Sequence, residues 1–182
     1  MNIIKKHTFV HYGFVLMIVA ALCGLAIGLT NSITAPIIEA RLAAERLEAY
    51  ELVMNGIADD DVLLEDEAFE VIVAYDVNAN TIGYVYTVTE TNQHGDFIVI
   101  VGVDTSGVVI GATFLVYEQT PTYKPITESN LELFIGLNIL SEVPNSSDIN
   151  TGATNSYNSL LSVFNKIKNF QQTEVMSVTT RG

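Results

Sequence analysis

The chain has 182 residues, of which 49% are apolar and 16% charged, and its formal net charge is −13. This balance argues against nucleic acid as a partner, because phosphates require a basic surface. The single cysteine excludes a disulfide framework, a thiolate zinc site and a cysteine-ligated iron–sulfur cluster.

The N-terminal region is an apolar segment long enough to cross a membrane. No Asp, Glu, Lys or Arg lies between Lys6 and Glu39, and residues 12–29 have no polar side chain beyond Tyr12. At about 1.5 Å per residue, this run and residues 30–33 span a hydrocarbon core of roughly 30 Å. A cleaved signal peptide has a shorter apolar core, so an uncleaved transmembrane helix is predicted.

The charges on either side of this segment indicate its orientation. Lys5 and Lys6 favour a cytoplasmic N-terminus. All 21 acidic residues lie at or after Glu39, together with six basic residues. Residues 39–182 therefore carry a formal net charge of −15. The sequence predicts a short cytoplasmic tail (residues 1–11) and a transmembrane helix (12–33). A juxtamembrane helix (34–55) and an extracytoplasmic domain (56–182) are predicted to follow. The predicted location is therefore the cell membrane, with a single pass.

The segment after the membrane reads as a helix followed by an acidic stretch. Pro36 can begin a new helical segment, and residues 37–54 are rich in helix formers with apolar residues at helical spacing. The acidic residues 59–70 lack the spacing and the turn glycine of a calcium-binding EF-hand. We expect a solvated acidic loop there.

Strands are expected next, because four segments are rich in β-branched and aromatic residues. Short turns separate them, which predicts an antiparallel meander with one covered face. A short helix is expected around residues 131–138 and an amphipathic helix over residues 156–170. The predicted strands are residues 69–75, 82–89, 97–103 and 108–117. The fold class is α+β: one N-terminal transmembrane helix and an antiparallel-sheet domain with flanking helices.

Catalytic signatures are nearly absent from the sequence. There is no nucleophile elbow, no phosphate-binding Walker loop and no dinucleotide fingerprint. His94 is the one histidine outside the membrane region, and a lone histidine in a turn is mostly solvated. We therefore predict no catalytic side chain and no metal site.

One segment, residues 148–156, is a candidate phosphate-binding turn. It reads D-I-N-T-G-A-T-N-S, a turn of small residues that opens onto the amphipathic helix. The free peptide N–H groups of a helix N-terminus, and the positive end of its dipole, would favour a phosphate. Thr154 and Ser156 are also ordinary helix-capping residues, and the spacing alone favours a cap.

This segment resembles the flavinylation motif of the FMN-binding domain family. The matching residues are Asp148, Thr151, Gly152, Ala153, Thr154 and Ser156. Other parts are similar to the G subunit of the Rnf electron transport complex: residues 29–40 to its membrane exit, residues 118–121 to its E-T-P loop, and residues 134–136 to its F-x-G stretch. Gln119 interrupts the E-T-P pattern, and Thr122 replaces a glycine that is frequent in the family. A second G-A-T, ending at Thr113, lacks the upstream residues and lies in a predicted strand.

The resemblance implies a covalent flavoprotein. FMN would be attached to Thr154 through a phosphoester by a dedicated flavin transferase, with Asp148, Thr151, Gly152, Ala153 and Ser156 forming the recognition and phosphate-binding shell. The protein would transfer electrons within an Rnf-type ion-translocating ferredoxin:NAD oxidoreductase. Other membrane subunits of that complex are the expected partners, and the chain would be an electron-transfer subunit rather than a complete enzyme.

Three alternatives stay open from the sequence. One is the C subunit of the sodium-translocating NADH:quinone reductase, which shares the motif but generally has a longer outer domain. Another is a stand-alone extracytoplasmic flavin carrier. The third is an unflavinylated membrane-anchored assembly or binding module, in which the T-G-A-T segment is only a helix cap.

Overall fold

The computed structural model describes residues 3–66, 68–141, 144 and 154–175. The chain divides into two compact units, Met1–Ala44 and Glu45–Gly182. The motif residues Asp148, Thr151, Gly152 and Ala153 lie outside the described residues, whereas Thr154 and Ser156 lie within them.

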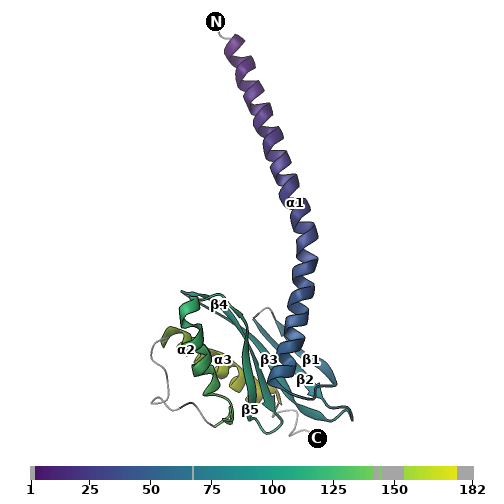
Figure 1. Cartoon of the computed structure of the whole chain (residues 1–182), viewed down its shortest axis with the longest axis vertical. Coiled ribbons are helices and arrows are strands. Elements are labelled where there is room, and N and C mark those ends of the chain that lie inside the picture. Colours follow the sequence, from purple (N-terminus) through teal and green to yellow (C-terminus); the bar gives the residue numbers. More distant parts are fainter. Residues whose placement is uncertain (1–2, 67, 142–143, 145–153, 176–182) are drawn as a thin grey trace. The chain divides into compact units, whose positions relative to one another are not determined.

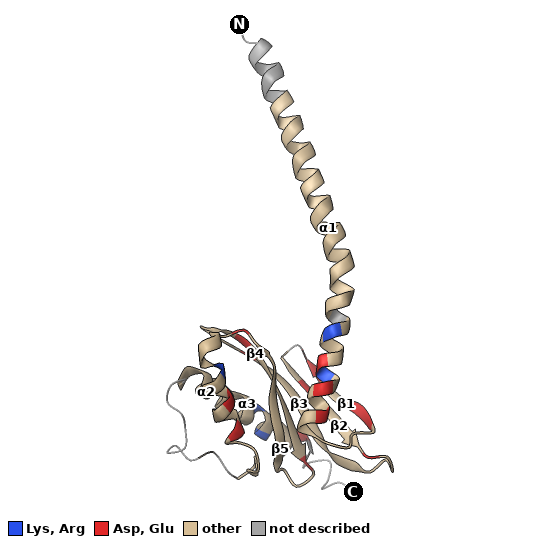
Figure 2. Cartoon of the chain, in the orientation of Figure 1, with Lys and Arg blue, Asp and Glu red and all other residues tan. Residues whose placement is uncertain are grey.

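The first unit consists of most of one long helix, α1 (Ile3–Val53), which continues through Pro36. The expected transmembrane and juxtamembrane segments are therefore one continuous helix. Its His11–Val53 part is long and apolar enough to cross a membrane, with a mean hydropathy of 2.4 over its most apolar stretch. In the part of α1 that Figure 2 colours, the charged residues lie towards the C-terminal end of the helix.

Hydroxyl groups in the apolar part of α1 bond to their own helix. The side chains of Thr30, Ser32 and Thr34 donate to carbonyl oxygens four residues earlier, at 2.9–3.0 Å. These bonds give the three hydroxyls acceptors within the helix itself.

The second unit is built on a five-stranded antiparallel sheet in the order β1-β2-β3-β4-β5 (Figure 1). The predicted meander is confirmed. The strands are β1 (Asp59–Asp66), β2 (Phe69–Tyr75), β3 (Thr81–Asn92), β4 (Gly95–Asp104) and β5 (Val109–Tyr117). Asp76 and Asp104 fix the β2–β3 and β4–β5 turns by accepting backbone N–H bonds.

Strand β1 corrects one expectation, because the acidic stretch does not form a loop. Asp59–Asp66 pairs antiparallel with β2, and all eight residues are exposed. An edge strand leaves room for charged side chains, and a bulge between Val62 and Leu64 interrupts its pairing. Both features discourage pairing with a further strand.

Both faces of the central strands are covered, which corrects the expectation of a single covered face. Successive residues of a strand point to opposite faces. In β4, Val99 and Val101 pack in the larger apolar cluster with α3, whereas Ile100 packs in a second cluster with Val53 and Met54. Burial on both faces explains the nearly continuous apolar sequence of β4.

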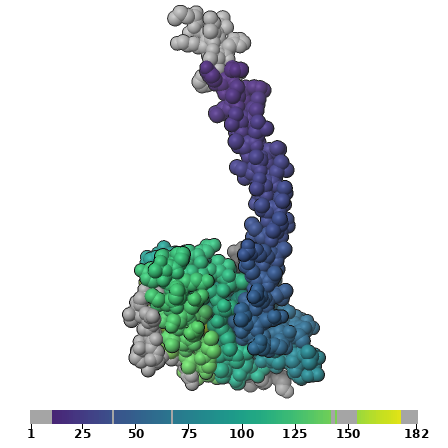
Figure 3. Space-filling model, viewed as in Figure 1, coloured from purple at the N-terminus to yellow at the C-terminus, as the bar shows by residue number. Residues whose placement is uncertain are grey.

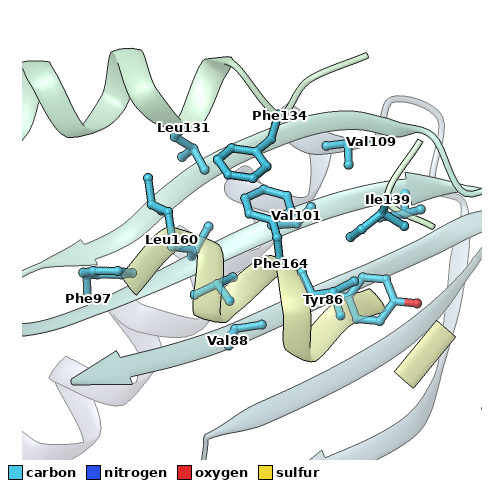
Figure 4. Packing of buried hydrophobic residues seen from close by; sticks show 14 of the residues in the cluster. Tyr86, Val88, Phe97, Val101, Val109, Leu131, Phe134, Ile139, Leu160 and Phe164 are labelled. Atoms are coloured by element: carbon cyan, nitrogen blue, oxygen red, sulfur yellow. The ribbon is translucent and has the colours of Figure 1, made fainter. Parts of the chain in front are cut away.

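The larger apolar cluster lies between the sheet and two helices, α2 (Lys124–Glu132) and α3 (Thr154–Phe170) (Figure 4). Its centre is a stacked pair of rings, Phe134 and Phe164, with centroids 3.8 Å apart and planes 3° from parallel. α3 confirms the predicted amphipathic helix. α2, green on the outer surface of this unit in Figure 3, lies earlier than the helix expected around residues 131–138.

The position of α2 has a local cause. Pro125 is tolerated in a first helical turn, since the N–H that it lacks has no partner in the helix there. The helix ends at Glu132, and the following residues turn back to β5. Gly136, at φ +88°, donates its N–H to the Val109 carbonyl at 2.8 Å.

Candidate functional site

The start of α3 presents one motif residue to solvent and turns another inward. Thr154 is the first residue of the helix and is exposed, whereas Ser156 is 6% exposed. Successive residues of a helix are rotated by about 100°, so side chains two positions apart point in nearly opposite directions. The buried face that continues from Ser156 is formed by Tyr157, Ser159, Leu160, Val163, Phe164 and Ile167. The amphipathic pattern of α3 therefore determines which motif hydroxyl faces outward.

The electrostatics of the α3 N-terminus suit an anion. The first turn has no acidic residue, and Lys168 occupies the last turn. The peptide N–H groups of the first turn have no carbonyl acceptor within the helix, and they form the positive end of the helix dipole. A phosphoester on the Thr154 hydroxyl would place its negative charge at this end.

Ser156 bonds to the segment that follows β5. Its hydroxyl donates to Oε1 of Gln119 at 2.7 Å, and both side chains are buried. Gln119 belongs to the segment that resembles the family's E-T-P loop. Gln119 interrupts the E-T-P pattern, and its side chain accepts the hydrogen bond from the motif residue Ser156.

The β3–β4 turn completes this contact region. Gln119 Nε2 donates to the carbonyl of Gly95 at 3.4 Å. Gly95 has φ +119°, and a Cβ there would lie 2.9 Å from the carbonyl oxygen of Glu118. A glycine is thus required on both grounds where the turn approaches residues 118 and 119.

His94, in the same turn, lies against the second residue of α3. Its ring Nε2 is 3.1 Å from Nδ2 of Asn155 and 3.2 Å from Nε2 of Gln93. The backbone N–H of His94 donates to Oδ1 of Asn92, whose amide in turn donates to Ser159 on α3 at 3.0 Å. His94 is exposed, as the sequence predicts, and it lies next to the motif.

Two tyrosines near the motif have different environments. Tyr157 is buried with its ring 6.3 Å from that of Phe134, and burial raises the pKa of its phenol. It is part of the core packing. Tyr123 is 47% exposed, and its carbonyl accepts a bond from Thr127.

The other candidate features lie away from this region. Thr113, the end of the second G-A-T, is within β5 and pairs with Ile100. In the part of the chain that is described, no group of three or more His, Cys, Asp or Glu side chains could hold a metal ion.

The N-terminal part of the chain is similar to a known protein family. Residues 1–53 match the family model described as the RnfG N-terminal region. This match supports an RnfG-type subunit of an Rnf complex, and α1 is consistent with membrane anchoring. No curated protein matches the chain.

Proposed function

We propose that FMN is attached covalently to Thr154 of this RnfG-type protein, which transfers electrons within an Rnf-type ion-translocating ferredoxin:NAD oxidoreductase. The carrying observation is the position of Thr154, exposed at the first turn of α3 with the Ser156 hydroxyl turned inward. The resemblance of residues 148–156 to the flavinylation motif supplies the identity of the group.

The surroundings of Thr154 fit a flavin phosphate. Thr154 is an exposed residue at the start of the helix, as access for a transferase requires. In the attachment, Oγ1 forms a bond to phosphorus, the phosphoanhydride bond of an activated flavin nucleotide breaks, and the hydroxyl proton leaves with the departing nucleotide. The helix N-terminus stabilises one negative charge by about 0.3–1 kcal/mol at exposed positions.

The protein's role in electron transfer is positional. Bound flavin supplies the redox chemistry, and the chain supplies attachment, orientation and local charge. No acid–base pair is needed for such a transfer, in keeping with the lack of catalytic motifs in the sequence. A covalent link also prevents loss of the cofactor from a domain outside the cytoplasm, where we place residues 56–182, with residues 1–11 in the cytoplasm.

In-gel fluorescence tests this function directly. The full chain is expressed together with a flavin transferase, denatured, and examined for flavin fluorescence and intact mass. We expect a fluorescent band carrying the added mass of FMN, and a dark band at the unmodified mass for Thr154→Ala.

Thr113→Ala is the matched control, because it removes the threonine of the second G-A-T, and we expect it to fluoresce like the wild type. A dark wild-type band at the unmodified mass would contradict the proposal and leave Thr154 as a helix-capping residue.

A further inference from the structure

The rotation of α3 about its own axis decides whether Thr154 faces the solvent. Thr154 and Ser156 lie about 200° apart around the helix. Rotation that brought Ser156 outward would therefore turn Thr154 towards the sheet. The buried apolar residues from Tyr157 to Ile167 set the rotation of the body of α3. The ends of helices fray, so contacts of the first turn decide whether Thr154 and Ser156 keep that rotation.

A directional contact exists in the first turn, and it is buried. Ser156 donates to Gln119 Oε1 at 2.7 Å, and Gln119 is 3% exposed. Gln119 Nε2 donates in turn to the Gly95 carbonyl, so both ends of its amide have partners. Breaking the pair would leave a buried hydroxyl and a buried amide oxygen without their bond, and this cost opposes displacement of the first turn of α3.

We propose that Gln119 is a positioning residue for flavin attachment: through Ser156 it holds the first turn of α3 in the rotation that exposes Thr154. This inference rests on the proposed function and adds to it a residue outside the motif. It also assigns Ser156 an inward role, in which its hydroxyl acts through Gln119 and the helix rather than on the flavin.

The chain contains a closely matched control residue. Gln171, in η3 (Gln171–Val175) beyond the C-terminal end of α3, is also a glutamine that is 3% exposed. It accepts a hydrogen bond from the hydroxyl of Tyr86 on β3. Gln171→Met removes a buried amide as Gln119→Met does, but at the opposite end of the helix from Thr154.

The experiment measures covalent flavin in full-length variants expressed with a flavin transferase. We expect Gln119→Met and Ser156→Ala each to slow flavin attachment about tenfold, as the loss of a buried hydrogen bond would. The double variant should be no slower than either single one, since both substitutions break the same bond. Ser156→Thr retains the hydroxyl and should attach flavin at close to the wild-type rate.

Stability and spectroscopy separate positioning from folding. Gln171→Met should lower the melting temperature about as much as Gln119→Met while attachment stays at the wild-type rate. Gln119→Asn, whose shorter amide cannot reach Ser156, provides a second variant if Gln119→Met does not fold. Flavin that does attach to either Gln119 variant should show an altered visible circular dichroism spectrum, because the helix that carries it is no longer fixed.

The outcomes distinguish the two proposals. A wild-type chain without covalent flavin would contradict the proposed function itself. Wild-type attachment together with unchanged attachment in the folded Gln119 variants would overturn the positioning role alone. Independent, multiplying effects of Gln119→Met and Ser156→Ala would also overturn it, because the two side chains would then not act through one bond.

Discussion

Glycines in the sheet allow the last turn of α1 to approach the backbone of two neighbouring strands. Gly102 on β4 and Gly111 on β5 are directly paired. A Cβ at Gly102 would lie 2.5 Å from the carbonyl oxygen of Val53, and a Cβ at Gly111 would lie 2.6 Å from the Val53 Cα. The neighbouring atoms belong to the backbone, so they cannot move aside as a flexible side chain can.

Gly102→Ala is expected to destabilise the domain by about 1–3 kcal/mol, the usual cost of overpacking. The measurement is the free energy of unfolding of the full chain in detergent, by urea titration. Gly24→Ala is the control, since beyond its chain neighbours and the adjacent helix backbone no described atom lies within 4 Å of the added methyl group. Equal unfolding free energies for Gly102→Ala and wild type would mean that Val53 does not contact the sheet at this point.

The β2–β3 turn depends on one ionised carboxylate. Oδ1 of Asp76 accepts the backbone N–H groups of Asn78 and Asn80, at 2.8 and 2.9 Å. These bonds, led by the backbone N–H of Asn80, hold the pKa of Asp76 below its usual value. Because the folded pKa is lower than the unfolded one, the stabilisation is complete above the unfolded pKa, at about pH 3.9, and is lost as the pH falls through the folded pKa.

Asp76→Ala should therefore lower the melting temperature at pH 6 and make progressively less difference as the pH falls below about 4. Melting curves of wild type and variant over this pH range provide the test. Val77→Ala, in the same exposed turn, changes no titrating group and serves as the control. A difference in melting temperature that is the same at every pH would contradict this role of the Asp76 charge.

Some elements can be predicted from the sequence because their signals are local. Strands β2 to β5 have β-branched residues between short turns, and α3 has an amphipathic period. β1 is not predicted, because its acidic residues are typical of loops. They are compatible with a strand because β1 lies at the edge of the sheet. The helix predicted around residues 131–138 is wrong in position, since α2 ends at Glu132. The apolar residues that suggested it, such as Phe134, belong to a turn that packs into the core.

The candidate site is predictable only in part, for a similar reason. Thr154 and Ser156 belong to a contiguous motif and so can be identified from the sequence. Gln119 and His94 cannot be linked to it, because they are 37 and 61 residues from their partners Ser156 and Asn155. Chain folding brings them together, and the only sequence signal is that residues 118–121 resemble a family loop.

The whole molecule joins an apolar helix to an acidic domain, and the boundary between them lies within α1. The compact domain begins at Glu45, before the end of the helix at Val53. The last turns of α1 and the residue that follows them are part of the core, since Ala49, Val53 and Met54 are buried in one cluster with Ile72 and Ile100 of the sheet. Arg46 adds an ion pair with Glu70 at 2.7 Å.

A chain that begins at Glu45 should therefore fold as a soluble domain, whereas one that begins at Ala58 should not. The shorter chain loses the burial of Val53 and Met54, each worth about 1.5–3 kcal/mol, and exposes the apolar face of the sheet. Size-exclusion chromatography and thermal unfolding of both chains measure this. Identical melting temperatures would show that α1 contributes nothing to the domain.

The central claim is covalent flavin at Thr154, and peptide mapping tests it most directly. The wild-type chain, made with a flavin transferase, is digested, and the fluorescent peptide is fragmented in a mass spectrometer. We predict that the flavin phosphate is located on Thr154 and on neither Ser156 nor Thr113. Flavin on another residue, or only unmodified peptides covering residues 148–156, would contradict the account.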